Sequence, residues 1–200
     1  MISFFILVIM YFAFSWGLPW HKLPSTISFS YVFDFLFALG VSFLFRLPWK
    51  FRWRVNKNTL ISFLEILALG VGTVAAIWYM EIEMPFRLVY NLEWHLLIFA
   101  PILEELVFRQ TFQRVLIKNM GGKRVTSMLV AAIFAFSHLV GLSVLPVEYV
   151  PFIGFQVFYT FILGVICGQA LLRFHSVFAP MALHFVFNLI FYIAMQFEII

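Results

Sequence analysis

Residues 96–116 read LLIFAPILEELVFRQTFQRVL, an apolar run that carries two adjacent glutamates, Glu104 and Glu105, with Arg109 four residues after the second. A carboxylate or a guanidinium at the centre of a bilayer costs about 2.5 to 3.5 kcal/mol, so such groups usually pair, face the interior of a helix bundle and mark a functional site. If the run crosses a membrane, these three charges are the first candidates for function.

The composition of the chain indicates that the run does lie in a membrane. The 200 residues are 64% hydrophobic, 20% aromatic and only 11% charged, and their mean hydropathy is +1.03. An ordinary soluble domain is about 45 to 50% apolar and about 25% charged. The sequence therefore predicts an integral membrane protein in contact with the lipid bilayer. The modest net charge of +4 gives no reason to expect nucleic acid as a partner.

Apolar segments follow one another along the chain, each close to the roughly 20 residues that a transmembrane helix needs. There are about seven: Ile2 to Trp20, Phe29 to Leu47, Leu60 to Met80, Trp94 to Ile117, Val125 to Leu139, Val150 to Leu172 and Val177 to Ile200. No hydrophilic stretch is long enough for a second domain. We expect residues 1–200 to form a single all-α transmembrane domain, a polytopic bundle of about seven (six to eight) helices.

Lys and Arg gather in every second connection between these segments. The basic connections hold Arg46, Lys50, Arg52, Arg54 and Lys57, then Arg114, Lys118, Lys123 and Arg124, then Arg173, whereas the others carry only Lys22 and Arg87. Because basic loops tend to stay in the cytoplasm, this pattern predicts an N-terminus inside the cell and, with seven spans, a C-terminus outside.

The two adjacent glutamates have different neighbours. Successive residues of a helix point about 100° apart, so Glu104 and Glu105 face different sides. Glu105 and Arg109, four residues apart, can form a salt bridge that braces the bundle. Glu104 has no cation on its own helix and must take up a proton or find a partner on another span.

Two later segments supply such partners. His138 lies near the end of one segment with Phe134 one turn before it, and His184 lies within the last segment with Asn188 one turn after it. A Glu and a His can hold and deprotonate a water molecule. A His and an Asn can donate hydrogen bonds to the oxyanion that forms when this water attacks a peptide carbonyl. The set has the chemistry of a hydrolase.

Three motifs, in order along the chain, resemble those of the CPBP family, which comprises the CaaX proteases and bacteriocin-processing enzymes and is also called the Abi family. They are Glu-Glu-x-x-x-Arg at Glu104, Glu105 and Arg109, Phe-x-x-x-His at Phe134 and His138, and His-x-x-x-Asn at His184 and Asn188. Each motif alone would be weak, but the ordered set is specific. The resemblance covers residues 94–200, which we expect to be the catalytic core.

The resemblance implies an intramembrane endopeptidase and a role for each motif residue. These roles are water activation by Glu104 and His138, an oxyanion hole formed by His184 and Asn188, a structural ion pair of Glu105 and Arg109, and packing under the site by Phe134. The substrate would be a small membrane-associated peptide or a prenylated, CaaX-type peptide. The short chain lacks a eukaryotic-type extension, so we expect it in a bacterial cytoplasmic membrane.

Zinc is the one cofactor that these residues suggest. Glu104, His138 and His184 would fill the set of two His and one carboxylate known from catalytic zinc sites. The sequence lacks a His-Glu-x-x-His motif, in which one helical turn presents two ligands. The resemblance favours a glutamate-type mechanism, so we predict a protease without a metal or other cofactor, with zinc as the alternative.

Two functions from other classes remain open. One is a non-catalytic bacteriocin-immunity or abortive-infection factor that acts by binding its target. The other is a carrier with Glu104 as its proton site, which would leave His184 and Asn188 without a role. Replacement of Glu104 by Gln separates an enzyme from a binder.

Other polar residues have simpler interpretations. We expect His95, beside Trp94, at the membrane interface and Cys167 as a small buried apolar side chain. Glu65 has no motif and is expected to be capped by solvent or by a neighbour. Neither Ser137 nor Cys167 has a base and an orienting group of its own, so neither is expected to be a nucleophile.

Overall fold

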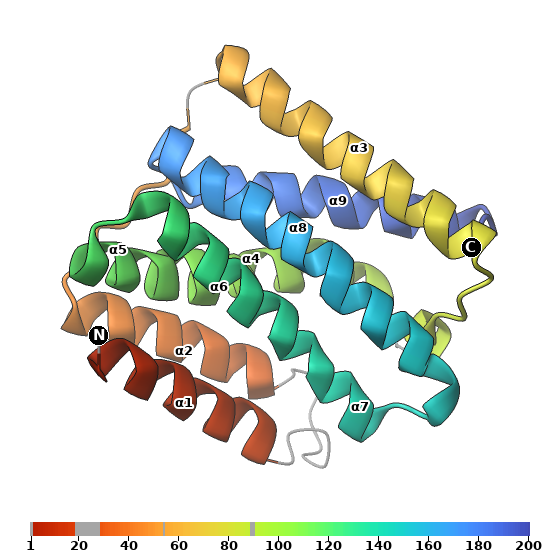
Figure 1. Ribbon diagram of the computed structural model, residues 1–200, viewed down its shortest axis with the longest axis horizontal. Coiled ribbons are helices and arrows are strands. Elements are labelled where there is room, and N and C mark those ends of the chain that lie inside the picture. Colours follow the sequence, from red (N-terminus) through yellow and green to blue (C-terminus); the bar gives the residue numbers. More distant parts are fainter. Residues whose placement is uncertain (1, 19–28, 54, 89–90) are drawn as a thin grey trace.

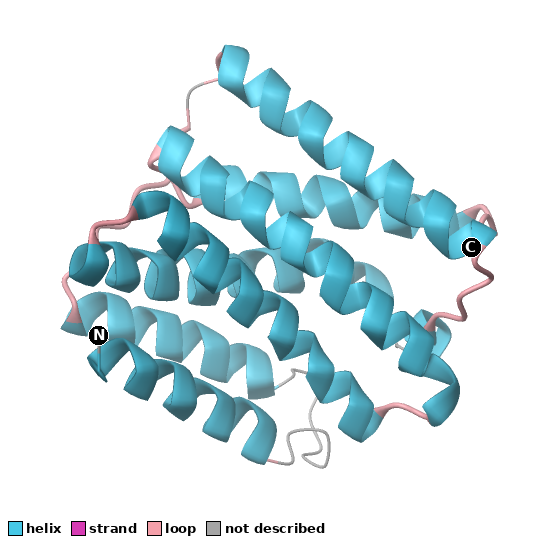
Figure 2. Ribbon diagram, viewed as in Figure 1, coloured by secondary structure: helices cyan, strands magenta, loops and turns pink. Residues whose placement is uncertain are grey.

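The computed structural model describes residues 2–18, 29–53, 55–88 and 91–200, and within these residues all regular structure is helical (Figure 2). Trp20, Lys22 and Arg54 lie outside the described residues, as does the side chain of Arg87. The predicted all-α fold is confirmed for the described chain.

Each apolar segment expected from the sequence forms one helix or, for the fourth segment, a run of consecutive helical elements, and we call each of these a helical pass. The longer elements are α1 (Ile2–Gly17), α2 (Phe29–Leu44), α3 (Lys57–Tyr79), α6 (Lys123–Ser137), α8 (Val150–Phe174) and α9 (Phe178–Gln196). The fourth pass is built from η3 (Trp94–Phe99), α4 (Ala100–Glu105), η4 (Leu106–Gln113) and α5 (Arg114–Met120), of which η3 and η4 are π-helical. Short turns complete the chain: η2 (Pro85–Leu88), η5 (His138–Val140), α7 (Gly141–Val144) and η6 (Val147–Tyr149).

Four helical runs of the described chain are long and apolar enough to cross a membrane. They are Lys57–Tyr79, Lys123–Val144, Val147–Phe174 and Phe178–Gln196, while α1 and α2 are shorter apolar helices. In hydrocarbon a helix satisfies all of its backbone hydrogen bonds internally, which explains why the apolar segments adopt this form. The prediction of a polytopic helical bundle is confirmed.

Helix ends have local causes in the sequence. Asn56 caps α3, because its Oδ1 accepts from the backbone N–H groups of Asn58 and Thr59 at 2.9 and 3.3 Å, while Thr59 Oγ1 accepts from the backbone N–H of Asn56 at 3.1 Å. This reciprocal arrangement is a capping box. At the C-terminal end of α5, Gly121 stops the helix with a left-handed φ of 71°, which glycine adopts without strain.

The helices lie in successive layers (Figure 1). From one edge to the other these are α3, then α9 with α8, then α6 with the fourth pass, then α2 and finally α1. The fourth pass contacts α2, α6, α8 and α9, so it lies inside the bundle. All eight residues of η4 are buried. The segment with the adjacent glutamates is therefore enclosed by helices from both halves of the chain.

Small residues allow α6 and α8 to approach closely. A Cβ added at Gly164 would lie 3.0 Å from the Cα of Ala131, and one added at Gly168 would collide with Oγ of Ser127. Small residues at such contacts are typical of helix pairs in membranes. On the outer side, Arg173 of α8 pairs with Glu65 of α3 at 3.2 Å. The sequence predicted that solvent or a neighbouring residue would cap Glu65, and Arg173 is that neighbour.

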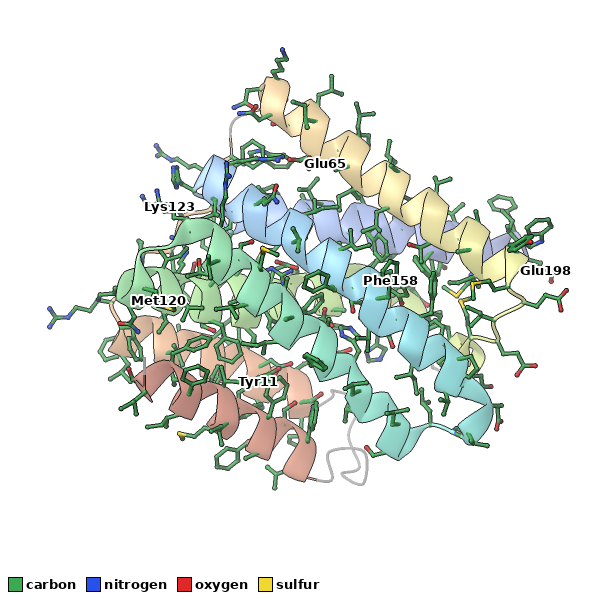
Figure 3. The ribbon with its side chains drawn as sticks, in the orientation of Figure 1. Tyr11, Glu65, Met120, Lys123, Phe158 and Glu198 are labelled. Carbon is green, nitrogen blue, oxygen red and sulfur yellow. The ribbon has the colours of Figure 1, made fainter. Side chains whose placement is uncertain are left out.

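The basic connections meet at one end of the bundle. The backbone N–H of Val177 donates to the carbonyl of Lys50 at 3.0 Å, and Nζ of Lys118 donates to the carbonyl of Phe45 at 3.0 Å. Lys123 lies at this end and Glu198 at the other (Figure 3). The two termini also lie at opposite ends (Figure 1). Which end faces the cytoplasm stays a prediction.

Candidate active site

Two π-helical turns frame the adjacent glutamates. Glu104 and Glu105 end the six-residue α4, with η3 before it and η4 after it. Pro101 lies in the first turn of α4 and has no N–H to donate to the preceding helical turn. π-Helical turns are rare and frequently occur at functional sites. The backbone thus departs from regular α-helix on both sides of the two carboxylates.

Glu105 is completely buried and has two partners. Its Oε2 lies 3.0 Å from Nε of Arg109, as the spacing of four residues predicts. Neither of these two atoms makes a well-directed hydrogen bond, so the contact is best described as an ion pair. Its Oε1 lies 2.9 Å from Nδ1 of His184, on α9. The sequence did not predict this second partner, because it joins residues 79 positions apart.

Arg109 is held by two groups besides Glu105, each on another helix. Its Nη2 donates to the carbonyl of Gly164 at 3.2 Å, and its guanidinium carbon lies 4.7 Å from the centre of the Phe134 ring. A cation over an aromatic face is favourable when both are removed from water. Arg109 therefore connects Glu105 to α6 and α8.

The ring of His184 has one nitrogen fixed and one near Glu104. A carboxylate accepts hydrogen bonds, so Nδ1 of His184 carries the proton in its contact with Glu105. Nε2 lies 3.8 Å from Oε2 of Glu104, too far for a direct hydrogen bond. His184 is buried, whereas the side chain of Glu104 is 31% exposed. Both glutamates thus face the same imidazole from opposite nitrogens.

The ring of His138 is oriented by its own helix. Its Nδ1 lies 3.0 Å from the carbonyl oxygen of Phe134, which can only accept, so Nδ1 carries the proton. In the neutral ring Nε2 is then the basic nitrogen. Oγ of Ser137 donates to the same carbonyl at 2.6 Å and is engaged there. The geometry gives His138 the tautomer that a base at Nε2 requires.

The buried ring of Phe134 packs against both imidazoles. Ring centres are 5.0 Å apart for Phe134 and His138 and 6.0 Å apart for Phe134 and His184, and both pairs are edge-to-face. Such aromatic pairs contribute about 0.5 to 1.5 kcal/mol beyond the area that they bury. Phe134 thus touches His138, His184 and Arg109 and fixes their relative positions.

Asn188 connects α9 to η3. Its Nδ2 donates to the carbonyl of Leu96 at 2.7 Å. An amide nitrogen has two hydrogens, so one N–H remains for another acceptor. Asn188 therefore combines the interhelical contact expected of an asparagine in a membrane bundle with one free donor.

One cavity of about 330 Å³ is lined by Glu104, His138, His184 and Asn188. Phe134 also lines it, and much of the remaining wall is apolar or aromatic, as at Leu163, Phe187 and Phe191. A largely apolar cavity with a few convergent polar groups is typical of a binding site. The Glu105–Arg109 pair is buried behind this cavity and does not line it.

Further polar residues line the cavity that the sequence did not single out as site residues: Tyr31, His95, Gln156, Tyr159 and Thr160. Oη of Tyr31 lies 2.7 Å from Nδ1 of His95, and the Tyr31 ring stacks on Phe99 with 5.1 Å between ring centres. His95 lies in the cavity wall, a position that the sequence did not predict, while its placement at the membrane interface stays a prediction. The available signal was weak: a polar ring within an apolar segment. Nothing in the spacing connects Tyr31 to it.

Among the described residues, no group of three or more His, Cys, Asp or Glu side chains is placed to hold a metal ion. Glu104 and the Nε2 atoms of His138 and His184 are the donors that zinc would need. Each ring has its Nδ1 engaged by a protein acceptor, which is the outer-shell arrangement common for ligating histidines. The donor types fit zinc, but their spacing in this structure does not form a site.

Cys167 and Ser137 show no sign of nucleophile chemistry. Cys167 is fully buried in α8, with Sγ 3.8 Å from the carbonyl oxygen of Pro180. It does not line the cavity, and neither does Ser137. The interpretation of Cys167 as a small buried side chain is consistent with this placement.

Residues 88–190 match the family model described as type II CAAX prenyl endopeptidase Rce1-like. The match covers just over half of the chain and includes every motif residue from Glu104 to Asn188. No curated protein and no solved structure gives a match.

Proposed function

Because the chain belongs to the Rce1-like family of type II CAAX prenyl endopeptidases, we propose that it hydrolyses a peptide bond of a lipidated or otherwise membrane-associated peptide by a glutamate-type mechanism. The family makes the chain an intramembrane protease. The roles of the individual residues and the class of substrate are what we propose.

Glu104 and His138 activate the water. A water molecule in the cavity donates one hydrogen to the carboxylate of Glu104 and the other to Nε2 of His138, and its oxygen attacks the scissile carbonyl carbon. Glu104 takes the proton as the C–O bond forms. When the C–N bond breaks, the same proton passes to the leaving amine. General-base catalysis of this kind contributes about 10² to 10⁴ in rate.

His184 and Asn188 stabilise the oxyanion. The N–H of Asn188 that Leu96 does not use is one donor. Donation from Nε2 of His184 requires the imidazolium form, because Nδ1–H is already directed at Glu105. Glu105 keeps the ring in this orientation, and Arg109 holds Glu105. Preorganised donors of this type supply about 2.7 to 4 kcal/mol each.

The observation that supports this proposal most strongly is the convergence of the four polar residues on one cavity. They come from α4, η5 and α9, and the cavity has apolar and aromatic walls. Such walls suit a substrate that carries an apolar modification or apolar side chains. Packing alone would not require one amide N–H and two imidazole Nε2 atoms, none of them hydrogen-bonded to a described protein group, at one apolar cavity.

The experiment is cleavage of a peptide that ends in a CaaX sequence, offered with and without a farnesyl group on its cysteine, by purified protein in detergent. Products are identified by mass spectrometry. Glu104→Gln should lower turnover by about 10² to 10⁴. Glu148→Gln, which changes an exposed glutamate outside the cavity, should leave turnover unchanged.

The outcomes separate the parts of the proposal. Parental turnover by Glu104→Gln would overturn the role of Glu104. Cleavage of the unmodified peptide alone would overturn the lipidated substrate class. A protein that binds both peptides and cleaves neither, with binding unchanged in Glu104→Gln, would support the non-catalytic alternative.

A further inference from the structure

A second cavity, of about 300 Å³, lies at the basic end of the bundle, away from the candidate active site. It is enclosed by the end of α2, the corner between α5 and α6 and the end of α8. Five basic side chains line it: Arg46, Arg114, Lys118, Lys123 and His175. The rest of its wall includes apolar residues such as Leu47, Ile117 and Leu171. No acidic residue lines it.

The cations of this cavity have no counter-charge among the described residues. None of the ion pairs in that part of the chain includes one of these side chains. Nε and Nη2 of Arg114 are buried and have no hydrogen-bond partner. Lys118 donates to a neutral carbonyl, that of Phe45. Because buried guanidinium nitrogens without partners are costly, an anion beside Arg114 would be favourable.

The walls of the cavity are fixed by hydrogen bonds. Nε2 of Gln110 donates to the carbonyl of Pro48 at 3.3 Å, which ties the connection after α2 to η4. Arg46 has a left-handed φ of 50°, at a helix end where glycine is usual. The backbone N–H of Leu47 donates back to the carbonyl of Ser42 at 2.8 Å and closes this end. An arginine therefore occupies a position that favours glycine, and its side chain lines the cavity.

We propose that this cavity binds a phosphate group, either the headgroup phosphate of an anionic phospholipid or that of a soluble phosphate compound. Guanidinium and ammonium groups are the donors that phosphate oxygens prefer. Basic pockets between transmembrane helices are suited to anionic lipid headgroups, and the apolar part of the wall suits the carbon chain beside such a headgroup. The site is independent of the proposed protease mechanism.

The test uses the full chain in detergent, with phosphatidylglycerol as the anionic probe and phosphatidylcholine as the neutral one. Native mass spectrometry counts the lipid retained per chain, and a titration gives its affinity. The test variant is Arg46→Gln with Lys123→Gln. The matched control is Arg52→Gln with Arg124→Gln, which removes the same charge from the same end outside the cavity. All four side chains are exposed, so both variants should fold.

The parent should retain one phosphatidylglycerol in preference to phosphatidylcholine. The cavity variant should bind it on the order of 25-fold more weakly, about five-fold for each cation removed, and the control should stay within about two-fold of the parent. Equal loss in both variants, or equal binding of both lipids, would overturn the proposal.

A third arm separates the two sources of phosphate. Inorganic phosphate and glycerol 3-phosphate are added to the parent loaded with phosphatidylglycerol. Retention of the lipid at millimolar concentrations supports a lipid headgroup site. Displacement that is lost in the cavity variant supports a site for a soluble phosphate compound.

Discussion

Oε1 of Glu105 lies 2.9 Å from Nδ1 of His184, so the glutamate that pairs with Arg109 on its own helix also orients a histidine on the last helix. The ion pair of Glu105 and Arg109, which the sequence predicted to be structural, therefore extends to His184. The buried carboxylate of Glu105 joins the ion pair to the proposed oxyanion donor. Changes at Arg109 should consequently affect stability and catalysis together.

We predict that Arg109→Ala lowers the melting temperature and the activity. The substitution leaves the buried carboxylate of Glu105 without its cation, a loss that costs about 3 to 5 kcal/mol for buried pairs. Combining it with Glu105→Gln should recover part of the stability, because no unpaired charge remains. Thermal unfolding in detergent measures both variants.

Arg173→Ala is the matched control for this prediction. It breaks the pair with Glu65, in which both side chains are about a third exposed, and exposed pairs contribute about 0 to 1 kcal/mol. A parental melting temperature for Arg109→Ala, with activity lost, would instead place Arg109 in direct contact with the reaction.

We predict that Gly164→Ala destabilises the protein and that Gly154→Ala, on the same helix, does not. A Cβ at Gly164 would lie 3.0 Å from both the Cα and the Cβ of Ala131, whereas nothing lies within 4 Å of a Cβ at Gly154. Overpacking of this kind costs about 1 to 3 kcal/mol. Because the carbonyl of Gly164 accepts from Arg109, turnover should fall as well. Equal melting temperatures for the two variants would contradict the close approach of α6 and α8.

We predict that Tyr31→Phe weakens substrate binding. The change removes the 2.7 Å contact with His95 but keeps the stacking on Phe99, so the cavity wall should loosen without a change of fold. One such hydrogen bond is worth about 0.5 to 1.5 kcal/mol, which corresponds to a rise in KM of about two- to ten-fold. Steady-state kinetics with the CaaX peptide measure this rise. Tyr79→Phe, at an exposed position, is the control, and a fall in kcat at constant KM would contradict the binding role.

The orientation predicted from the basic connections can be tested by labelling. In intact cells a membrane-impermeant maleimide should label Glu198→Cys, while Lys123→Cys should react only after the membrane is opened. The native Cys167 is fully buried and should stay unlabelled in both variants. The opposite pattern would reverse the assigned topology, and with it the side from which the cavity is reached.

The helical passes could be predicted because hydrocarbon imposes a strong signal on sequence. Each pass needs about 20 apolar residues with internally satisfied backbone groups, so composition alone marks it. The Glu105–Arg109 contact could be predicted for a related reason, since helix periodicity fixes which neighbours meet. Both inferences use only local sequence.

The remaining features of the site depend on tertiary structure. The contact between Glu105 and His184 and the pair of Tyr31 and His95 join distant segments, and no local pattern encodes them. The π-helical turns around α4 have no propensity signal in the sequence. The family resemblance predicted that the motif residues share one site, but it did not predict the contact between Glu105 and His184.

The last prediction concerns the two roles open to His184. If His184 and Asn188 donate to the oxyanion, Asn188→Ala and His184→Ala should each lower turnover by about 10² to 10³, with weaker effects on KM. If His184 is a zinc ligand instead, His184→Ala should strip the metal and Asn188→Ala should be the milder change. Elemental analysis of active protein, beside turnover after exhaustive chelation, separates the two cases. Stoichiometric zinc whose removal and return switch activity off and on would overturn the glutamate-type mechanism and make Glu104, His138 and His184 its ligands.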